Sequence, residues 1–415
     1  MGKIKNNKGG FPIMDNNIVD ALKEKVKLKV FCCGAGNAGS QFIDAAYKAG
    51  FKDVFCINSS SRDMDNDVLN ANIPCFLVGS DGRGAGMNRN AAKELFKMNY
   101  RHLFENQKFV QYCEESDVIV VGTSCSGGTG SGVSPIVVKA IKQMYPNKIV
   151  MFYGILPRLT GSDVELSNAM ACVAEIEELN KSGLGIPYML ADLNYYEGIS
   201  NEVAFVKVVE KMVTDIKVIA GDYLNYSKYR MIDENDMKVI TSPAGYMSIY
   251  KIDNITQQMV DKESIQSMLI KQIKHSPAVE IARDGLVDQM AFIYSVPEDM
   301  GDSAKSGDYA EINNYVGRPL GIFENYAIVR GGTAQVILIV SGQSYPVGKM
   351  TTINEIIRSG AEARRQKIEA RKTADSSLNS TYKFLQDSSV SNVDLTGKSK
   401  SVDESDKNDI LNNLF

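Results

Sequence analysis

Apolar and polar positions along the first half of the chain follow a pattern typical of strands separated by helices. Short apolar runs predict strands, and segments with apolar residues three or four positions apart predict helices. The predicted strands are residues 26–33, 53–58, 73–78, 117–122, 148–156 and 187–193. The predicted helices are residues 39–50, 91–113, 162–181 and a segment that carries Ile136 to Met144. This alternation predicts an α/β fold with a parallel sheet covered by helices on both faces.

The second half has a different pattern. Apolar residues at helical spacing from Asn201 predict a long helix that links two domains, and strands are expected near residues 290–296, 326–330 and 334–341. A basic helix and a polar tail rich in Ser, Asp, Asn and Lys follow, and such a tail is predicted to be disordered. We therefore expect five parts: a first domain at 1–200 with an N-terminal extension at 1–27, a linking helix at 201–222, a second α+β domain at 223–350, a basic helix at 351–372 and a tail at 373–415.

Composition narrows the function. The chain has 415 residues, 44% of them hydrophobic, and a net charge of −4, which argues against a direct nucleic-acid-binding face. No apolar run approaches the ~18 residues of a membrane span, and the N-terminus lacks a signal-peptide core, so a cytoplasmic protein without a membrane partner is expected. The seven cysteines lack Cys-x-x-Cys spacing and are expected to be core residues, and two histidines disfavour a histidine-based triad or metal site.

A run dense in glycine and hydroxyl residues carries the most specific chemistry. Residues 123–132 (TSCSGGTGSG) follow a predicted strand directly and precede a predicted helix. Glycines let backbone N–H groups approach a ligand, hydroxyls add donors, and a helix N-terminus attracts negative charge. The run lacks the Gly-Lys-Ser/Thr of a P-loop. It nevertheless predicts a phosphate-binding loop.

A second glycine-rich turn leaves an alternative open. Gly34 to Gly39 (GAGNAG) matches the G-x-G-x-x-G of dinucleotide-binding proteins, between a strand and a helix. That fingerprint also needs an acid at the end of the second strand, where this chain has Asn58 followed by serines. A Rossmann-type enzyme that uses NAD or S-adenosylmethionine is therefore an alternative with incomplete support.

Taken together, the loops resemble those of the tubulin/FtsZ superfamily. Residues 126–132 (SGGTGSG) are similar to its signature loop GGGTG[ST]G, residues 57–60 (INSS) to its INTD, and residues 82–88 (GRGAGMN) to its GAGxN loop. The resemblance implies a Rossmann-like GTP-binding domain with GTP or GDP as cofactor and Mg²⁺. It also implies nucleotide contacts from the following residues of the four loops: Gly34, Ala35, Gly36, Asn37, Asn58, Gly84, Ala85, Gly86, Asn88, Ser126, Gly127, Gly128, Thr129, Gly130, Ser131 and Gly132.

Three further residues are assigned to the nucleotide by the same resemblance. Pro157 precedes the position of the family's ribose-binding glutamate, which is Gly161 here, and Glu165 lies one turn further on. Ser162 and Glu165 also have the spacing of a helix capping box, so capping is an alternative for Glu165. Phe205 occupies the place of the aromatic residue that stacks on the base, with a core position as its alternative.

Two acids in the second half are candidates for hydrolysis. Residues 231–246 resemble the FtsZ segment NxDxxD followed by a helix and Gly-Tyr, with Asp233 and Asp236 at the two acids and Met231 in place of the asparagine. Acids three apart also suit a helix N-terminus, so capping is the alternative. The resemblance implies that these acids orient the attacking water on the nucleotide of the next subunit in a head-to-tail filament, so that GTP is hydrolysed at the subunit interface.

Within the superfamily, the long basic C-terminal helix and the irregular loops look most like the TubZ type of plasmids and phages. This implies a dynamic filament in a bacterial host that segregates or positions DNA through a DNA-binding adaptor held by the C-terminal helix or tail. An FtsZ-like division GTPase is one alternative. A protein that binds nucleotide without turnover is another, because Gly161 and Met231 depart from the family pattern.

Overall fold

The computed structural model describes residues 27–64, 72–80, 82–227, 230–281, 286–300 and 309–387. The chain divides into two compact units, Met1–Arg358 and Ser359–Phe415. No helix within the described ranges is long and apolar enough to cross a membrane. The N-terminal extension up to residue 26 and the tail from residue 388 lie outside the described residues.

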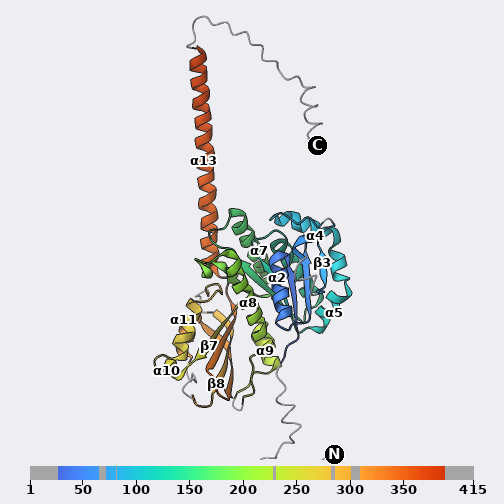
Figure 1. Ribbon diagram of the computed structural model, residues 1–415, viewed down its shortest axis with the longest axis vertical. Helices are drawn as coiled ribbons and strands as arrows, with labels where there is room; N and C mark the ends of the chain where they lie inside the picture. Colours follow the sequence, from blue (N-terminus) through green and yellow to red (C-terminus); the bar gives the residue numbers. More distant parts are fainter. Residues whose placement is uncertain are drawn as a thin grey trace, which may run out of the picture. The chain divides into compact units, whose positions relative to one another are not determined.

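The first half forms the predicted parallel sheet (Figure 1). Its strands are β1 Val30–Ala35, β2 Val54–Asn58, β3 Cys75–Leu77, β4 Val118–Ser124, β5 Ile149–Leu156 and β6 Pro187–Asp192. They lie in the order β3-β2-β1-β4-β5-β6, and every neighbouring pair is parallel. The α/β fold class is therefore confirmed.

Helices cover both faces of this sheet, because alternate strand residues feed two separate cores. On one face, α2 Gly36–Lys48 and α8 Asn201–Ile219 pack against side chains such as Cys32 and Met151. On the opposite face, strand residues such as Phe31 and Phe152 pack against four other helices. These are α4 Arg89–Phe104, α5 Gln107–Glu115, α6 Thr129–Met144 and α7 Asp163–Lys181.

One predicted helix is two helices in the structure. The region 91–113 was expected to be continuous, but α4 ends at Phe104 and α5 begins at Gln107. The side chain of Asn106 accepts hydrogen bonds from the backbone N–H groups of Lys108 and Phe109, both at 3.1 Å. An asparagine at this position caps a new helix and so ends the previous one.

The second half extends the same sheet. Its strands are β7 Gly245–Ile255, β8 Leu286–Pro297, β9 Arg318–Val329 and β10 Ala334–Gln343, in the order β7-β10-β8-β9. β7 pairs with β6 only at Pro187↔Gly245 and Tyr188↔Tyr246. The helices of this half are α9 Glu234–Thr241, α10 Gln257–Val260, α11 Ile265–Lys274 and α12 Ala310–Val316. The sequence pattern missed β7, and β9 begins earlier than predicted.

The predicted linking helix is α8, which Figure 1 shows between the strands of the first half and those of the second. Val213 and Ile216 of α8 share one core with residues of β5, β8 and β10. The domain boundaries placed at residues 200 and 222 stay a prediction.

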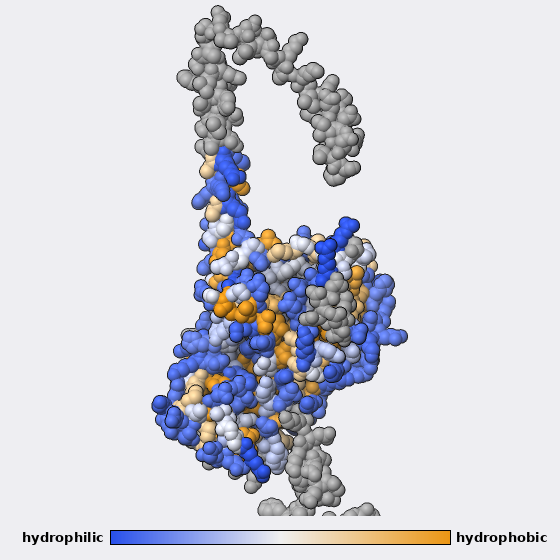
Figure 2. Space-filling view, viewed as in Figure 1, coloured by the Kyte–Doolittle hydropathy of each residue, from blue (hydrophilic) through white to orange (hydrophobic). Residues whose placement is uncertain are grey.

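The C-terminal helix is longer than predicted at both ends. α13 spans Val347–Asp387, so part of the predicted disordered tail, residues 373–387, is helical. Its first turns belong to the first unit, where Met350 and Ile353 are buried in the core. Beyond Arg358 its described side chains are mostly hydrophilic (Figure 2).

Candidate functional site

Loops at the carboxyl ends of β1 to β5 enclose a cavity of about 910 Å³ with the N-terminus of α8. Carboxyl ends of parallel strands are where ligands bind on sheets of this type. Most of the predicted nucleotide-binding residues line it: Ala35, Gly36, Asn37, Asn58, Gly84, Ala85, Gly86, Ser126, Gly127, Gly128, Thr129, Gly130, Pro157, Glu165 and Phe205.

Glycine is required where the loops beside the cavity approach one another closely. Gly36 has φ +73°, and a Cβ there would lie 2.9 Å from the backbone N of Gly130. A Cβ on Gly128 would lie 2.8 Å from the backbone N of Asn88. Only glycine lets these backbones pack so closely, and α6 then begins at Thr129 with its N-terminus at the cavity. Free N–H groups at a helix N-terminus bind anions.

Hydroxyl groups join the loops into one surface. Ser59, after β2, and Thr129, at the start of α6, share a hydrogen bond of 2.6 Å between their side-chain oxygens. Ser124 and Ser126 share another at 2.8 Å. Hydroxyls both donate and accept, so a bound phosphate can receive hydrogen bonds from these groups without a new charge in the wall.

Asn168 of α7 holds two of the loops together, and no sequence motif marks this residue. Its side-chain Nδ2 donates to the backbone oxygens of Met87 and Ser126, each at 2.9 Å, and to that of Gly127 at 3.3 Å. Met87 belongs to the loop before α4, whereas Ser126 and Gly127 belong to the loop before α6. One buried amide therefore fixes the distance between the two glycine-rich loops.

Four predicted residues do not line the cavity. Gly34 lies in β1, where a Cβ would collide with the backbone oxygen of Gly39. Asn88 caps α4 through a hydrogen bond from the Ala91 N–H at 3.0 Å. The other two lie inside α6, where the hydroxyl of Ser131 donates to a backbone oxygen of the preceding turn and a Cβ on Gly132 would contact the backbone of α4. All four shape the loops rather than the cavity wall.

Glu165 caps α7, as the alternative predicted, and it also lines the cavity. Oε2 of Glu165 accepts from the backbone N–H of Ser162 at 2.7 Å and from its hydroxyl at 2.9 Å. Glu165 nevertheless lines the cavity, as does Gly161. Phe205 is partly buried against the core and also lines the cavity.

Several lining residues were missed by the sequence analysis. Arg83 and Arg158 supply two positive charges to the wall. Arg158 is positioned by hydrogen bonds from its guanidinium to the backbone oxygens of Tyr196 and Ile199, at 2.9 and 2.7 Å. Asn201, the first residue of α8, also faces the cavity. The one available signal for Arg158 was its place directly after the strand β5 and Pro157.

Asp233 and Asp236 lie away from this cavity and form a capping box on α9. Each carboxylate accepts a hydrogen bond from the other residue's backbone N–H, at 2.8 and 3.1 Å. One turn further on, Lys238 of α9 pairs with Asp117 at 2.9 Å. Asp117 immediately precedes β4, whose other end, Ser124, lines the cavity. The seven-residue strand separates the two ends by roughly 20 Å.

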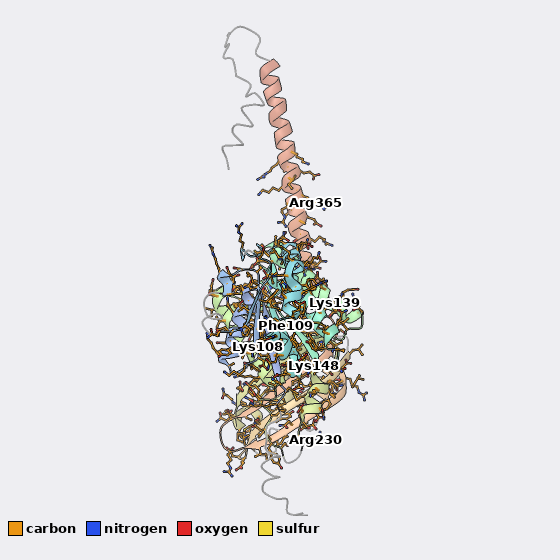
Figure 3. The ribbon with its side chains drawn as sticks, turned by 90° about the vertical axis from the view of Figure 1, so that its right-hand side faces the viewer. Lys108, Phe109, Lys139, Lys148, Arg230 and Arg365 are labelled. Carbon is orange, nitrogen blue, oxygen red and sulfur yellow. The ribbon has the colours of Figure 1, made fainter. Side chains whose placement is uncertain are left out.

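The surface beside α9 is rich in charge. Asp117, Lys148 (labelled in Figure 3) and Lys238 line a groove at the amino ends of β4 and β5. Burial disfavours ionised Asp117, but hydrogen bonds from Lys238 and from the backbone of Lys29 outweigh it, so the pKa of Asp117 is lowered. Hydrogen bonds to Glu234 and Asp117 raise the pKa of Lys238. α9 is therefore attached to the sheet edge opposite the cavity by an ion pair.

Comparison with known proteins identifies the cavity-bearing half. Residues 29–184 match the model of the tubulin/FtsZ family, GTPase domain. Over these residues the chain is similar to the GTPase domain of the tubulin/FtsZ family. This match covers the strands β1 to β5 and all four glycine-rich and hydroxyl-rich loops. It favours the tubulin/FtsZ interpretation over the dinucleotide-binding alternative for the first loop.

Relatives extend the likeness to the second half. The chain is 26% identical over 350 residues to the tubulin-like protein TubZ of Clostridium botulinum C phage, covering 82% of this chain and 86% of that protein. The crystal structure of Clostridium botulinum phage c-st TubZ is similar with a TM-score of 0.65 at 22% identity, over 81% of this chain and 99% of that one. A GTPγS-form protofilament of Bacillus thuringiensis serovar israelensis TubZ has a TM-score of 0.67 at 16% identity, over 86% and 99%. The tubulin/FtsZ fold therefore includes both halves.

Proposed function

We propose that this protein is a GTPase that assembles head to tail into dynamic filaments and hydrolyses GTP at the interface between subunits. GTP or GDP would occupy the cavity at the carboxyl ends of the strands. The glycine-rich loops and the N-terminus of α6 suit the phosphates, and Phe205 suits the base. A volume of about 910 Å³ is in the usual range for small-molecule sites.

The proposal includes Mg²⁺, which would be held mainly by the phosphates of the nucleotide. The described residues contain no cluster of three His, Cys, Asp or Glu side chains that would hold a metal ion alone. Mg²⁺ at phosphates typically keeps several waters and takes only one or two carboxylates from the protein. Asp63, a carboxylate of the wall, fits that role. Bound there, the ion would neutralise phosphate charge during hydrolysis.

One observation carries the proposal: the two candidate acids lie at the edge of the sheet opposite the cavity. A group that orients the attacking water must lie within hydrogen-bond reach of it, and a seven-residue strand prevents this within one molecule. Asp233 is exposed at the start of α9 and available to a neighbouring molecule. A contact between unlike ends of identical subunits generates an open filament, in which each interface completes one site.

The first test is phosphate release from GTP with light scattering recorded in parallel, across a series of protein concentrations. Both signals should rise above one shared threshold, because a site completed by a neighbour is active only in the polymer. Turnover per subunit that stays flat across the assembly threshold would contradict the shared site. GTP binding without turnover at any concentration would support the binding-only alternative.

Mixing two inactive variants tests the shared site more directly. Asp236→Asn removes an acid and keeps the cavity. Gly130→Ala overpacks the loops beside the cavity and keeps the acids, and it is inactive at a GTP concentration too low for its weakened affinity. The mixture should release phosphate that neither variant releases alone, because some interfaces then contain one intact half-site from each. A mixture of Asp233→Asn with Asp236→Asn is the control and should stay inactive. A mixture of the first pair that is no more active than its components would refute complementation.

For the cellular role we infer DNA segregation or positioning of the TubZ type, through an adaptor bound by the C-terminal segment. α13 carries exposed basic side chains beyond the core, including Arg365, labelled in Figure 3. A dense positive charge suits an acidic protein partner. A chain that ends at residue 358 keeps the first compact unit and loses these basic side chains. It should keep concentration-dependent GTP turnover and lose plasmid maintenance in cells. Unimpaired maintenance would place the adaptor site outside the C-terminal segment.

A further inference from the structure

Two cysteines face each other on the outer strands of the parallel sheet, close to the cavity. Cys56 of β2 and Cys75 of β3 are register partners. Neighbouring strands lie about 4.8 Å apart, within the Cα separations that disulfides span. The thiol of Cys75 donates to the backbone oxygen of Ile73 at 3.1 Å. Cys56 is buried and Cys75 is partly exposed, and both are free thiols.

A short chain of hydrogen bonds connects this pair to the cavity wall. The sulfur of Cys56 lies 3.1 Å from the hydroxyl oxygen of Ser40, on α2. The same hydroxyl donates to the backbone oxygen of Gly36 at 3.1 Å and accepts from the side-chain amide of Asn58 at 3.4 Å. Gly36 and Asn58 both line the cavity. A shift of the Cys56 sulfur would therefore reach Gly36 and Asn58 of the cavity wall through the Ser40 hydroxyl.

We propose that Cys56 and Cys75 are an oxidation-sensitive pair whose reversible disulfide weakens nucleotide binding in the adjacent cavity. The proposal rests on the nucleotide-binding function proposed above. A disulfide draws the Cys56 sulfur toward β3 and away from the Ser40 hydroxyl, so Ser40 loses a partner and its hold on Asn58 changes. In a reducing compartment such a disulfide is transient, as expected of a sensor and not of a structural bridge.

The oxidant is a low-molecular-weight disulfide, and the chemistry balances over two exchanges. The thiolate of Cys75 attacks one sulfur of the oxidant, which forms a mixed disulfide and releases one thiolate. The sulfur of Cys56 loses its proton and attacks the Cys75 sulfur, which forms the protein disulfide and releases the second thiolate. Two protein thiols are oxidised, and one disulfide is reduced to two thiols.

The roles of the two sulfurs follow from their surroundings. The neighbouring Cys56 lowers the pKa of Cys75, although partial burial opposes this. The neighbouring Cys75 and burial raise the pKa of Cys56. Nucleophilic attack needs a thiolate and access, and the lowered pKa and partial exposure of Cys75 favour both.

A second thiol pair shows why access matters. Cys172 and burial both raise the pKa of Cys125, which lies in the glycine-rich loop, and both cysteines are 0% exposed. An oxidant cannot reach either sulfur in the folded protein. This pair is the internal control for selectivity.

The chemical part of the proposal is tested by peptide mapping. The folded full-length chain is incubated with oxidised glutathione, its remaining thiols are blocked, and the digest is analysed by mass spectrometry. The expected product is a Cys56–Cys75 peptide pair that dithiothreitol releases. Recovery of both cysteines as blocked free thiols, or a Cys125–Cys172 bridge in their place, would overturn the assignment.

The functional part is tested by the affinity for a fluorescent GDP analogue before and after oxidation. Oxidation should weaken binding about 3- to 10-fold, the range for one lost hydrogen bond, and dithiothreitol should restore it. Cys75→Ser should bind as the reduced chain does and stop responding to oxidised glutathione, whereas Cys113→Ser, with a buried thiol elsewhere, should respond fully. A disulfide that leaves affinity unchanged, or a Cys75→Ser chain that still responds, would overturn the switch.

The two levels of failure are distinguishable. If the reduced chain fails to bind GDP or GTP, the proposed function fails, and peptide mapping still decides whether the disulfide forms. If the reduced chain binds nucleotide and the mapped disulfide has no effect on affinity, the function stands and the switch is refuted.

Discussion

The two ends of the parallel sheet are formed by different types of residue. At the carboxyl end, the cavity wall is rich in glycine and hydroxyl residues, held by buried hydrogen bonds such as that between Ser59 and Thr129. At the amino end, α9 presents the acids Asp233 and Asp236 and is attached by the Lys238–Asp117 pair. The first surface suits an anionic ligand, and the second presents two carboxylates.

On the proposed function, neither end is a complete hydrolytic site. Phosphoryl transfer to water needs both a cradle for the phosphates and a group that orients the nucleophile. The cradle alone would bind nucleotide, and the acids alone would have no substrate. A rigid sheet keeps the two ends apart in one molecule, so the proposed activity requires two molecules. Each variant below changes one end, or the connection between them.

The largest effect is expected from the acids. Asp233→Asn and Asp236→Asn should each lower GTP turnover about 10²- to 10⁴-fold, the usual contribution of a general base, and leave GTP affinity unchanged. Asparagine is chosen because it keeps the oxygen that accepts the capping hydrogen bond while it removes the carboxylate. The measurement is phosphate release above the assembly threshold, with nucleotide affinity measured separately.

The neighbouring Glu234→Ala is the matched control, since this acid belongs to the same turn of α9 and pairs with Lys238. It should retain normal turnover. Normal turnover in both asparagine variants as well would assign Asp233 and Asp236 to capping alone.

A buried ion pair on α8 attaches this helix to strands of both halves of the sheet. Lys211 of α8 donates to both carboxylate oxygens of Asp215, at 2.6 and 2.7 Å, and to the backbone oxygen of Ile249 at 2.9 Å, while Tyr153 of β5 donates to Asp215 at 2.6 Å. Lys211→Met leaves Asp215 buried without its cation. This should lower the free energy of unfolding by about 3–5 kcal/mol, measured by urea denaturation.

The effect should depend on pH in a defined direction. Burial raises the pKa of Asp215 even though Lys211 opposes this. A carboxyl group whose folded pKa is raised contributes stability in full below its unfolded pKa and loses it as pH rises through the folded pKa. The deficit of Lys211→Met should therefore grow with rising pH. Adding Asp215→Leu should remove most of the deficit, and Lys97→Met, at an exposed pair, should cause none.

Much of the fold was predictable because it depends on local pattern. The strands of the first half and α8 repeat apolar residues at regular spacing, and both faces of the sheet are covered, so the pattern is strong. β7 was missed because its second half, after Tyr250, is partly exposed and polar. The break between α4 and α5 depends on one asparagine inside an otherwise helical region.

The site was predictable where backbone geometry demands glycine, and not where a side chain acts across the fold. Gly36 and Gly130 meet across two loops, and the resemblance to the tubulin/FtsZ loops located both. Asn168 and Arg158 act through contacts with backbone oxygens far along the chain. No local spacing encodes such contacts. Pairing of Cys56 with Cys75 likewise follows from strand register, which the sequence does not contain.

Two glycines of residues 126–132 test whether the cavity depends on close backbone packing. A Cβ at Gly130 would lie 2.1 Å from the Thr123 hydroxyl and 2.8 Å from the Ala35 backbone oxygen, whereas a Cβ at Gly127 meets nothing within 4 Å. Gly130→Ala should weaken nucleotide binding about 10- to 100-fold, because overpacking typically costs 1–3 kcal/mol at the affected site. Gly127→Ala should bind almost normally. Equal affinities, measured by titration with a fluorescent GDP analogue, would mean that the loops adjust freely.

The smallest effect is expected from the side chain that spaces the two glycine-rich loops. Asn168→Leu keeps the approximate size of the side chain and removes the hydrogen bonds to Met87 and Ser126. Nucleotide affinity should fall about 3- to 10-fold, since the loops lose a shared donor while the cavity wall itself is unchanged. Asn180, on the same helix, bonds the backbone N–H and oxygen of Ile186 at the far end of α7. Asn180→Leu should lower stability and leave affinity intact, so an affinity loss shared by both variants would trace the effect to α7 as a whole.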